Sequence, residues 1–220
     1  MLLLLLCATG TLSAQKSSKL KGAIGYFRAG YNLMSVGDLN SQLTAQNLPG
    51  VSAPSFSTGG GGLAINKNWL LGGEGYGFIS QKNTANGYTN QYDGGRGEFM
   101  LGYALVHKKT LFLAPVLGIG GYHFQMDLHH DLGSGNSFNQ VLSNPNNATQ
   151  LKEHGWAASG KLLYEIKFMK FLFLGLEAGY NYSLSTSKWA IYGQAISTGP
   201  KTTLDGAFFG LSIGGGFIGN

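Results

Sequence analysis

The sequence is poor in charge and nearly free of cysteine. Charged side chains make up 11% of its 220 residues, under half the share of about 25% that is typical of soluble domains. A soluble protein needs surface charge to stay dispersed, whereas a surface that faces lipid needs none. The single cysteine, Cys7, lies near the N-terminus. These two shortages favour an exported, lipid-facing protein without disulfide bonds.

Long apolar runs are missing too. After the first fifteen residues, no segment approaches the roughly 18 apolar residues of a membrane-spanning helix. A chain of this kind that crosses a membrane must do so as a closed β-barrel, because lipid offers no hydrogen-bond partner to the free edge of a sheet. Proline is also scarce, and four of the five prolines lie in or beside long polar stretches.

Glycine and aromatic residues are abundant, with 36 glycines and 12% aromatics. Apolar residues recur at every second position in segment after segment, which is the pattern of a half-buried strand. One face of each clear segment carries Leu, Ile, Phe, Tyr or Trp, and the other carries glycine and charge. The alternation predicts eight strands, at residues 21–32, 55–66, 69–81, 96–107, 111–127, 155–169, 171–184 and 205–219.

The connections between these segments alternate in length. Short turns are predicted at 67–68, 107–110 and 169–170, and long polar stretches at 33–54, 82–94, 128–154 and 185–204. This layout is typical of outer-membrane barrels, whose short turns are periplasmic. An even number of strands then places both termini at the periplasmic end. Pro115 lies within a predicted strand and cannot donate to the ladder, so we expect a bulge there.

We therefore predict an all-β fold, an eight-stranded antiparallel up-and-down transmembrane β-barrel, over residues 15–220. The soluble alternative is a lipocalin-like barrel, which would bury its apolar face and expose its charges. The lumen of eight strands is too narrow for the aromatic face but fits the glycine-rich one, which favours the membrane barrel. Residues 1–14 are predicted to be a cleaved signal peptide, because an apolar stretch precedes the suitable cleavage site Leu12-Ser13-Ala14.

Seven charged residues, three basic and four acidic, fall on the predicted inner faces: Arg28, Glu74, Arg96, Glu98, Lys161, Glu165 and Glu177. With pairing centred on Met169, Lys161 would lie directly opposite Glu177. The pattern Leu-Gly-x-Glu occurs at 71–74 and 174–177, and its glycine is expected to leave room for a neighbouring long base. We interpret the seven residues as a structural salt-bridge network in the lumen. A gated ion path is the alternative, although eight strands normally leave no continuous channel.

Basic residues gather at the predicted periplasmic end: Lys16, Lys19, Lys21, Lys67, Lys108, Lys109, Lys167 and Lys170. Lysines in such positions reach lipid phosphates. Interfacial aromatic girdles are predicted from Trp69, Phe168 and Phe171 at that end and from Tyr31, Trp156, Tyr180 and Tyr182 at the other. Nucleic-acid binding is not expected, because the chain has two arginines and both fall in the predicted lumen.

No motif indicates catalysis or a bound cofactor. Adjacent histidines on a polar loop, as in His129-His130-Asp131, rarely converge on a metal without further ligands, so we predict no metal site. The stretch His123-Phe124-Gln125 has glutamine where an outer-membrane lipid deacylase carries its serine, and glutamine cannot act as the nucleophile. The glycine runs at 59–62 and 214–216 match no phosphate-binding loop.

On the strand rhythm, the two Leu-Gly-x-Glu segments and the aromatic-glycine ending at 214–220, the chain resembles the OmpA/OmpX-like family of small outer-membrane β-barrels. The resemblance implies a monomer in the outer membrane of a gram-negative bacterium. It implies contact with phospholipid and lipopolysaccharide, and insertion by the outer-membrane assembly machinery. The partner of the long loops stays unknown.

Three functions are open at this point. The first is a non-enzymatic structural or surface-interaction role, the second is a small channel for small or apolar solutes, and the third is a lipid-modifying enzyme. The absence of a catalytic motif favours the first.

Overall fold

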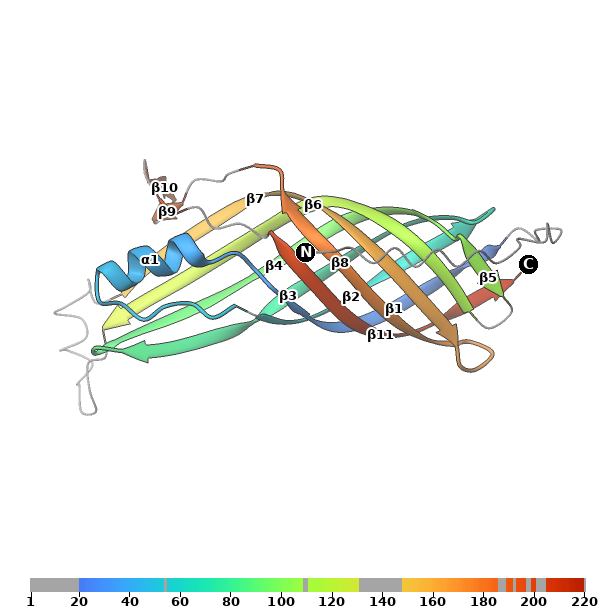
Figure 1. The fold of residues 1–220 in the computed structure, drawn as a ribbon, viewed down its shortest axis with the longest axis horizontal. Helices are drawn as coiled ribbons and strands as arrows, with labels where there is room; N and C mark the ends of the chain where they lie inside the picture. The colour runs from blue at the N-terminus through green and yellow to red at the C-terminus, as the bar shows by residue number, and fades with distance from the viewer. Residues whose placement is uncertain are drawn as a thin grey trace, which may run out of the picture.

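The computed structural model describes residues 20–53, 55–108, 111–130, 148–185, 189–191, 193–196, 199–200 and 205–219. Within these ranges, eight long strands form an antiparallel sheet that closes on itself as a barrel (Figure 1). The predicted fold class is confirmed. The predicted signal peptide, residues 1–14, lies outside the described residues and stays a prediction.

The barrel strands are β1 (Lys21–Asn32), β2 (Ser55–Asn66), β3 (Trp69–Ala85), β4 (Tyr88–Tyr103), β6 (Leu111–His130), β7 (Ala148–Lys167), β8 (Leu172–Ser183) and β11 (Gly206–Gly219). They follow one another around the barrel in chain order, and β11 closes it by pairing with β1. The smaller elements are α1 (Gly37–Ala45), β5 (Val106–Lys108), β9 (Ala190–Ile191) and β10 (Gln194–Ala195). Among the described residues, no helix is long and apolar enough to cross a bilayer.

The two ends of the barrel differ. At the turn end, on the right in Figure 1, Lys21 pairs with both Asn66 and Gly219, so both ends of the described chain lie beside the β2–β3 turn. The opposite, loop end carries α1, β9 and β10. Here β3, β4, β6 and β7 extend beyond the other strands, since β2 pairs with β3 only up to Phe78 and β8 pairs with β7 only from Ala157. We call these protruding parts the raised wall.

The predicted long loop at 82–94 is wrong. β3 continues to Ala85 and β4 begins at Tyr88, so the strands meet in a two-residue turn, Asn86-Gly87. Both turn residues have positive φ, 54° and 76°, as a type I′ hairpin requires. The polar residues of this stretch are therefore strand residues of the raised wall.

The predicted register between β7 and β8 is also wrong, by two residues. Lys161 lies opposite Gly179 rather than Glu177. Four residues separate the two strands instead of the expected two, which centres the turn on Lys170 rather than Met169. A shift of two preserves the face of the sheet on which a side chain lies. Lys161 and Glu177 therefore still face the lumen, as diagonal neighbours.

Pro115 is accompanied by the expected bulge. Pairing between β4 and β6 ends at Gly102 and Val116, and pairing between β5 and β6 begins at Val106 and Leu113. Three residues on one side therefore lie opposite two on the other. The extra residue falls where proline has no N–H to offer to the ladder.

The outer face of the barrel carries a belt of exposed apolar side chains. Phe99, Leu117 and Leu211 are 64%, 71% and 63% exposed. On β3 the belt runs from Trp69 to Ile79; this interval of ten residues, at about 3.3 Å per residue and a strand tilt of about 40°, gives a height of about 25 Å. A soluble barrel would bury such a face. The belt therefore excludes the lipocalin-like alternative and defines a transmembrane barrel.

The lumen is filled in three layers, which follow one another along β3 as Leu70, Glu74 and Phe78. Leu70 belongs to an apolar cluster at the turn end, and Phe78 belongs to a second apolar cluster at the loop end, which Leu39 and Leu43 of α1 complete. The charged residues lie between the two clusters.

The face of Leu, Ile, Phe, Tyr and Trp lies outside the lumen, as predicted, but the loop end of the lumen also holds aromatic rings from other positions. The rings of Tyr92 and Phe124 stack there with their centroids 5.3 Å apart, and the rings of Phe78 and Phe124 stack with their centroids 5.5 Å apart. Gly94 makes the space, because a Cβ at this position would lie 2.5 Å from Cδ1 of Phe124.

Candidate functional site

Lys161 lies at the centre of the charged layer. Its Nζ is 2.8 Å from Oε1 of Glu74, 3.3 Å from Oε2 of Glu177 and 3.4 Å from Oε1 of Glu98. The lysine comes from β7 and the three carboxylates come from β3, β8 and β4. One buried ammonium group therefore links four strands across the lumen.

Arg28 of β1 binds two of these carboxylates, those of Glu177 and Glu74. Its guanidinium forms an ion pair with Glu177, and its Nη1 lies 3.7 Å from Oε1 of Glu74. The guanidinium carbon also lies 4.3 Å from the ring centroid of Tyr76, which is a cation–π contact. The hydroxyl of Tyr26 donates to Oε2 of Glu74 at 2.9 Å. Glu74 is therefore held by neutral and cationic donors together.

Arg96 and Glu98 form the second half of the layer. Nη2 of Arg96 lies 2.5 Å from Oε2 of Glu98, and Nη1 donates to the amide oxygen of Asn181. The hydroxyl of Ser159 donates to the same Oε2 atom at 2.7 Å. Because Glu98 also contacts Lys161, the two halves form one network.

Glu165 is buried but lies outside this network. Its Oε1 accepts a hydrogen bond of 3.3 Å from the hydroxyl of Ser212, and no lysine or arginine in the described part of the chain forms an ion pair with it. A Cβ on Gly175 would lie 2.4 Å from Oε1 of Glu165. This glycine therefore makes room for an acid. A Cβ on Gly72 would lie 2.0 Å from the carbonyl oxygen of Gly62, so that glycine makes room for backbone. The predicted role of these glycines beside a base is wrong.

The apolar clusters on both sides keep water away from the ion pairs. In such surroundings charges attract more strongly than at a surface, but removing each ion from water costs several kcal/mol. The network holds three cations, Arg28, Arg96 and Lys161, and three carboxylates, Glu74, Glu98 and Glu177, so its formal charge is zero. Each member therefore depends on the others for its compensation.

The structure places all seven predicted lumen residues inside the barrel, brings six of them together and leaves Glu165 apart. Their neutral partners Tyr26, Ser159 and Asn181 were not predicted from the sequence. A signal for two of them was present, because Tyr26 and Ser159 each lie two residues before a charged lumen residue and so share its face of the strand.

The predicted basic residues and aromatic girdles lie toward the two ends of the barrel. Lys21, Lys67 and Lys170 lie at the turn end, whereas Lys16, Lys19 and Lys109 are outside the described residues. In the girdles, Trp69 at the turn end and Trp156 toward the loop end are 55% and 61% exposed. The described ranges contain no group of three or more His, Cys, Asp or Glu that could hold a metal ion, and Asp131 lies outside them.

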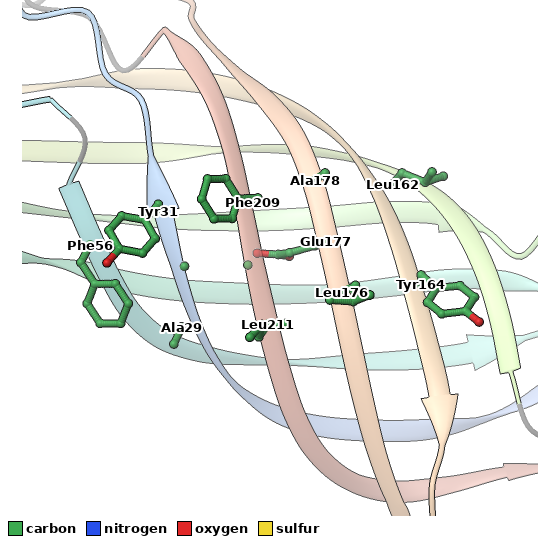
Figure 2. Close-up of a pocket in the computed structure, with 12 residues that line it drawn as sticks. Ala29, Tyr31, Phe56, Leu162, Tyr164, Leu176, Glu177, Ala178, Phe209 and Leu211 are labelled. Atoms are coloured by element: carbon green, nitrogen blue, oxygen red, sulfur yellow. The ribbon is translucent and has the colours of Figure 1, made fainter. Parts of the chain in front are cut away.

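A groove of about 740 Å³ crosses the outer face of β7, β8, β11, β1 and β2 (Figure 2). Phe56 and Tyr31 line one side of it, and Leu162 and Tyr164 line the other. Four of its lining residues are small, Ala29, Gly30, Ala178 and Gly210, and Glu177 lines it as well. Its lining is otherwise almost wholly apolar, which suits an apolar occupant.

The closed sheet and the apolar belt define the class of the protein, an eight-stranded transmembrane β-barrel. No protein-family model matches the chain, and no curated protein matches it significantly. Among solved structures, Ail, the attachment invasion locus protein of Yersinia pestis, is 9% identical with a TM-score of 0.45, over 92% of this chain and 99% of its own. The outer membrane protein OprG from Pseudomonas aeruginosa is 10% identical with a TM-score of 0.49, over 92% and 98%. Neither similarity assigns a role to this chain, and membership of the OmpA/OmpX-like family stays a prediction.

Proposed function

We propose that this chain is an integral outer-membrane protein of a gram-negative bacterium, with a structural or surface-interaction role and no catalytic activity. The apolar belt carries the proposal. A closed barrel makes all its backbone hydrogen bonds between its own strands, and an outward apolar face about 25 Å tall matches the hydrocarbon core of a bilayer. Bacterial single-chain barrels of this kind lie in the outer membrane, which agrees with the predicted signal peptide.

The proposed orientation places the turn end in the periplasm and the raised wall outside the cell. Lys21, Lys67 and Lys170 would then lie at the phospholipid leaflet, where ammonium groups attract phosphates. The opposite end of the belt would contact lipopolysaccharide. Insertion by the outer-membrane assembly machinery and a monomeric state complete the proposal.

The lumen residues have a structural role in this proposal. The ion pairs, together with the apolar clusters above and below them, fill the barrel and join its strands. A filled lumen does not favour a gated ion path. In planar bilayers we expect no single-channel current above background, and reproducible conductance steps would contradict the structural role.

Heat-modifiability tests the membrane proposal. The folded chain should migrate faster on a gel when it is not boiled, and it should refold only when lipid or detergent is supplied. Cell fractionation should recover it with the outer membrane. A chain that folds in plain buffer, or that is recovered with another fraction, would contradict the proposal.

The outer groove favours a second candidate function, the passage of small apolar solutes along the barrel wall. In this case the chain should speed the entry of the apolar dye N-phenylnaphthylamine through the outer membrane of whole cells. Ala178→Phe would fill the groove and should abolish the gain, whereas Leu101→Phe, on the belt away from the groove, should preserve it. Equal entry with and without the chain would eliminate this candidate.

A further inference from the structure

A second, smaller cavity lies at the loop end and belongs neither to the ion-pair network nor to the outer groove. Its volume is about 240 Å³. It is lined by Leu43 of α1, Met126 of β6 and Leu151 of β7. Trp189 and Ile196, beside the short strands β9 and β10, line it as well. Three separate parts of the chain therefore meet around it.

The lining sets the chemistry of an occupant. Among the residues that the structure describes, no charged side chain lines the cavity, and its polar side chains are the amides of Gln42 and Gln46, which are exposed near the end of α1. An ion placed inside would lose its hydration without a charged partner, which is strongly unfavourable. An uncharged molecule could bury its apolar part among the aliphatic side chains and turn a polar group toward the glutamines.

The walls of the cavity are held by contacts that need no ligand. Trp189 is 3% exposed, and its indole N–H donates to the carbonyl oxygen of Pro200 at 3.0 Å. The side chain of Asn40 exchanges two hydrogen bonds, of 2.7 and 2.8 Å, with the backbone of Val51, which fixes α1 to the segment that follows it.

The same segment is fastened to the raised wall. The amide of Asn83 donates to the carbonyl of Gly50 at 2.8 Å, and the amide of Asn90 donates to the carbonyl of Pro49 at 3.0 Å. Small-molecule sites are usually pre-formed in this way.

We propose that this cavity binds one small, uncharged, mainly apolar molecule of one or two rings. An apolar cavity of about 150 Å³ accommodates benzene, so a cavity of about 240 Å³ has room for a substituted or fused ring. The proposal adds a ligand to the loop end and does not depend on the role of the outer groove. It requires only that the barrel is folded, which the unboiled gel reports separately.

Trp189 provides the measurement, because it is one of three tryptophans and the other two, Trp69 and Trp156, are exposed on the belt. In the full chain carrying Trp69→Phe and Trp156→Phe, Trp189 is the sole tryptophan. Bromobenzene, a contact quencher, should quench its fluorescence along a saturable curve. A reference variant, Trp69→Phe with Trp189→Phe, leaves Trp156 in the detergent, where quenching should rise linearly without saturation.

Two comparisons separate binding in the cavity from partition into detergent. Ile196→Phe fills part of the cavity and should weaken saturable quenching by about tenfold or more, whereas Leu176→Phe on the belt should leave it unchanged. At neutral pH the anion 4-bromobenzoate should quench Trp189 far more weakly than bromobenzene. Linear quenching of Trp189, indifference to Ile196→Phe, or equal binding of the anion would each overturn the proposal.

Discussion

At the scale of single residues, Lys161 has the most demanding position. Its ammonium group contacts three buried carboxylates on three different strands. Replacing it with methionine keeps much of the side-chain volume but leaves three acids with two arginines. We expect Lys161→Met to lower the free energy of unfolding by about 3–5 kcal/mol, as for other buried ion pairs that lose one partner.

Urea titration of the refolded barrel measures this loss. Lys152→Met is the matched control, because Lys152 is an exposed residue of the same strand, and such substitutions usually change stability by about 0.5 kcal/mol or less. If the two variants unfold at the same urea concentration, the lumen charges do not form the network described above.

Replacing glutamate with glutamine should have opposite effects on stability at Glu165 and at Glu177. Glu177 shares its carboxylate between Arg28 and Lys161, whereas Glu165 accepts a hydrogen bond from the hydroxyl of Ser212. Glu165→Gln removes an uncompensated buried charge and keeps an acceptor, so stability should stay equal or rise. Glu177→Gln should cost about 3 kcal/mol or more, because it leaves buried cations short of a partner. Urea midpoints compare the two variants directly, and a larger loss for Glu165→Gln would reverse the assignment.

At the scale of elements, the sequence predicts a strand well where its two faces differ clearly. The predicted range of β8, 171–184, differs from the observed Leu172–Ser183 by one residue at each end, because one face of β8 meets lipid and the other meets the lumen. The alternation of apolar and polar residues does not predict the strands of the raised wall. There both faces carry polar residues, as in Asn83 and Asn90 on the inside and His129 on the outside, so the alternation of apolar and polar residues is lost. The turn pair Asn86-Gly87 still marks the hairpin, since both residues tolerate positive φ.

For the candidate site, the sequence predicts which residues face the lumen but not which of them are in contact. Parity along a strand places Arg28, Glu74 and Lys161 on the lumen side without knowledge of the turns. It cannot decide which charges touch, because one extra pair of residues in a turn shifts every partner along the neighbouring strand. That shift occurs between β7 and β8, where the length of the Lys161 side chain still allows contact with Glu177.

The hydrogen bonds that hold the segment after α1 should protect it from protease. Asn83 and Asn90 donate to two carbonyls of this segment, at Gly50 and Pro49. Replacing both asparagines with alanine leaves these carbonyls without their donors, at a cost of about 1–3 kcal/mol for each that remains out of water. We expect faster cleavage by protease around residues 46–53 of the folded barrel. Gln91→Ala, on the outer face of the same hairpin, serves as the control and should leave the cleavage rate unchanged.

At the scale of the whole molecule, the belt defines which substitutions the membrane opposes. Leu117 and His129 both point outward from β6, twelve residues apart, but Leu117 is on the belt and His129 is on the raised wall. Leu117→Arg should destabilise the barrel in lipid by about 2–4 kcal/mol if it lies near the midplane, and His129→Arg by about 0–1 kcal/mol. Unfolding in liposomes measures both, and equal losses would show that the belt does not mark the bilayer.

The raised wall has a further consequence for the molecule in water. A sheet that leaves the membrane presents two open edges, and open edges invite other strands to add to them. Here β9 pairs with Leu151 and Lys152 along the β7 edge, and the side chains of Gln81 and Asn83 bind the segment around Gly50 to β3, the strand at the other edge. The chain therefore supplies its own edge protection where the bilayer can no longer provide it, which allows the loop end to project into a crowded surface without templating aggregation.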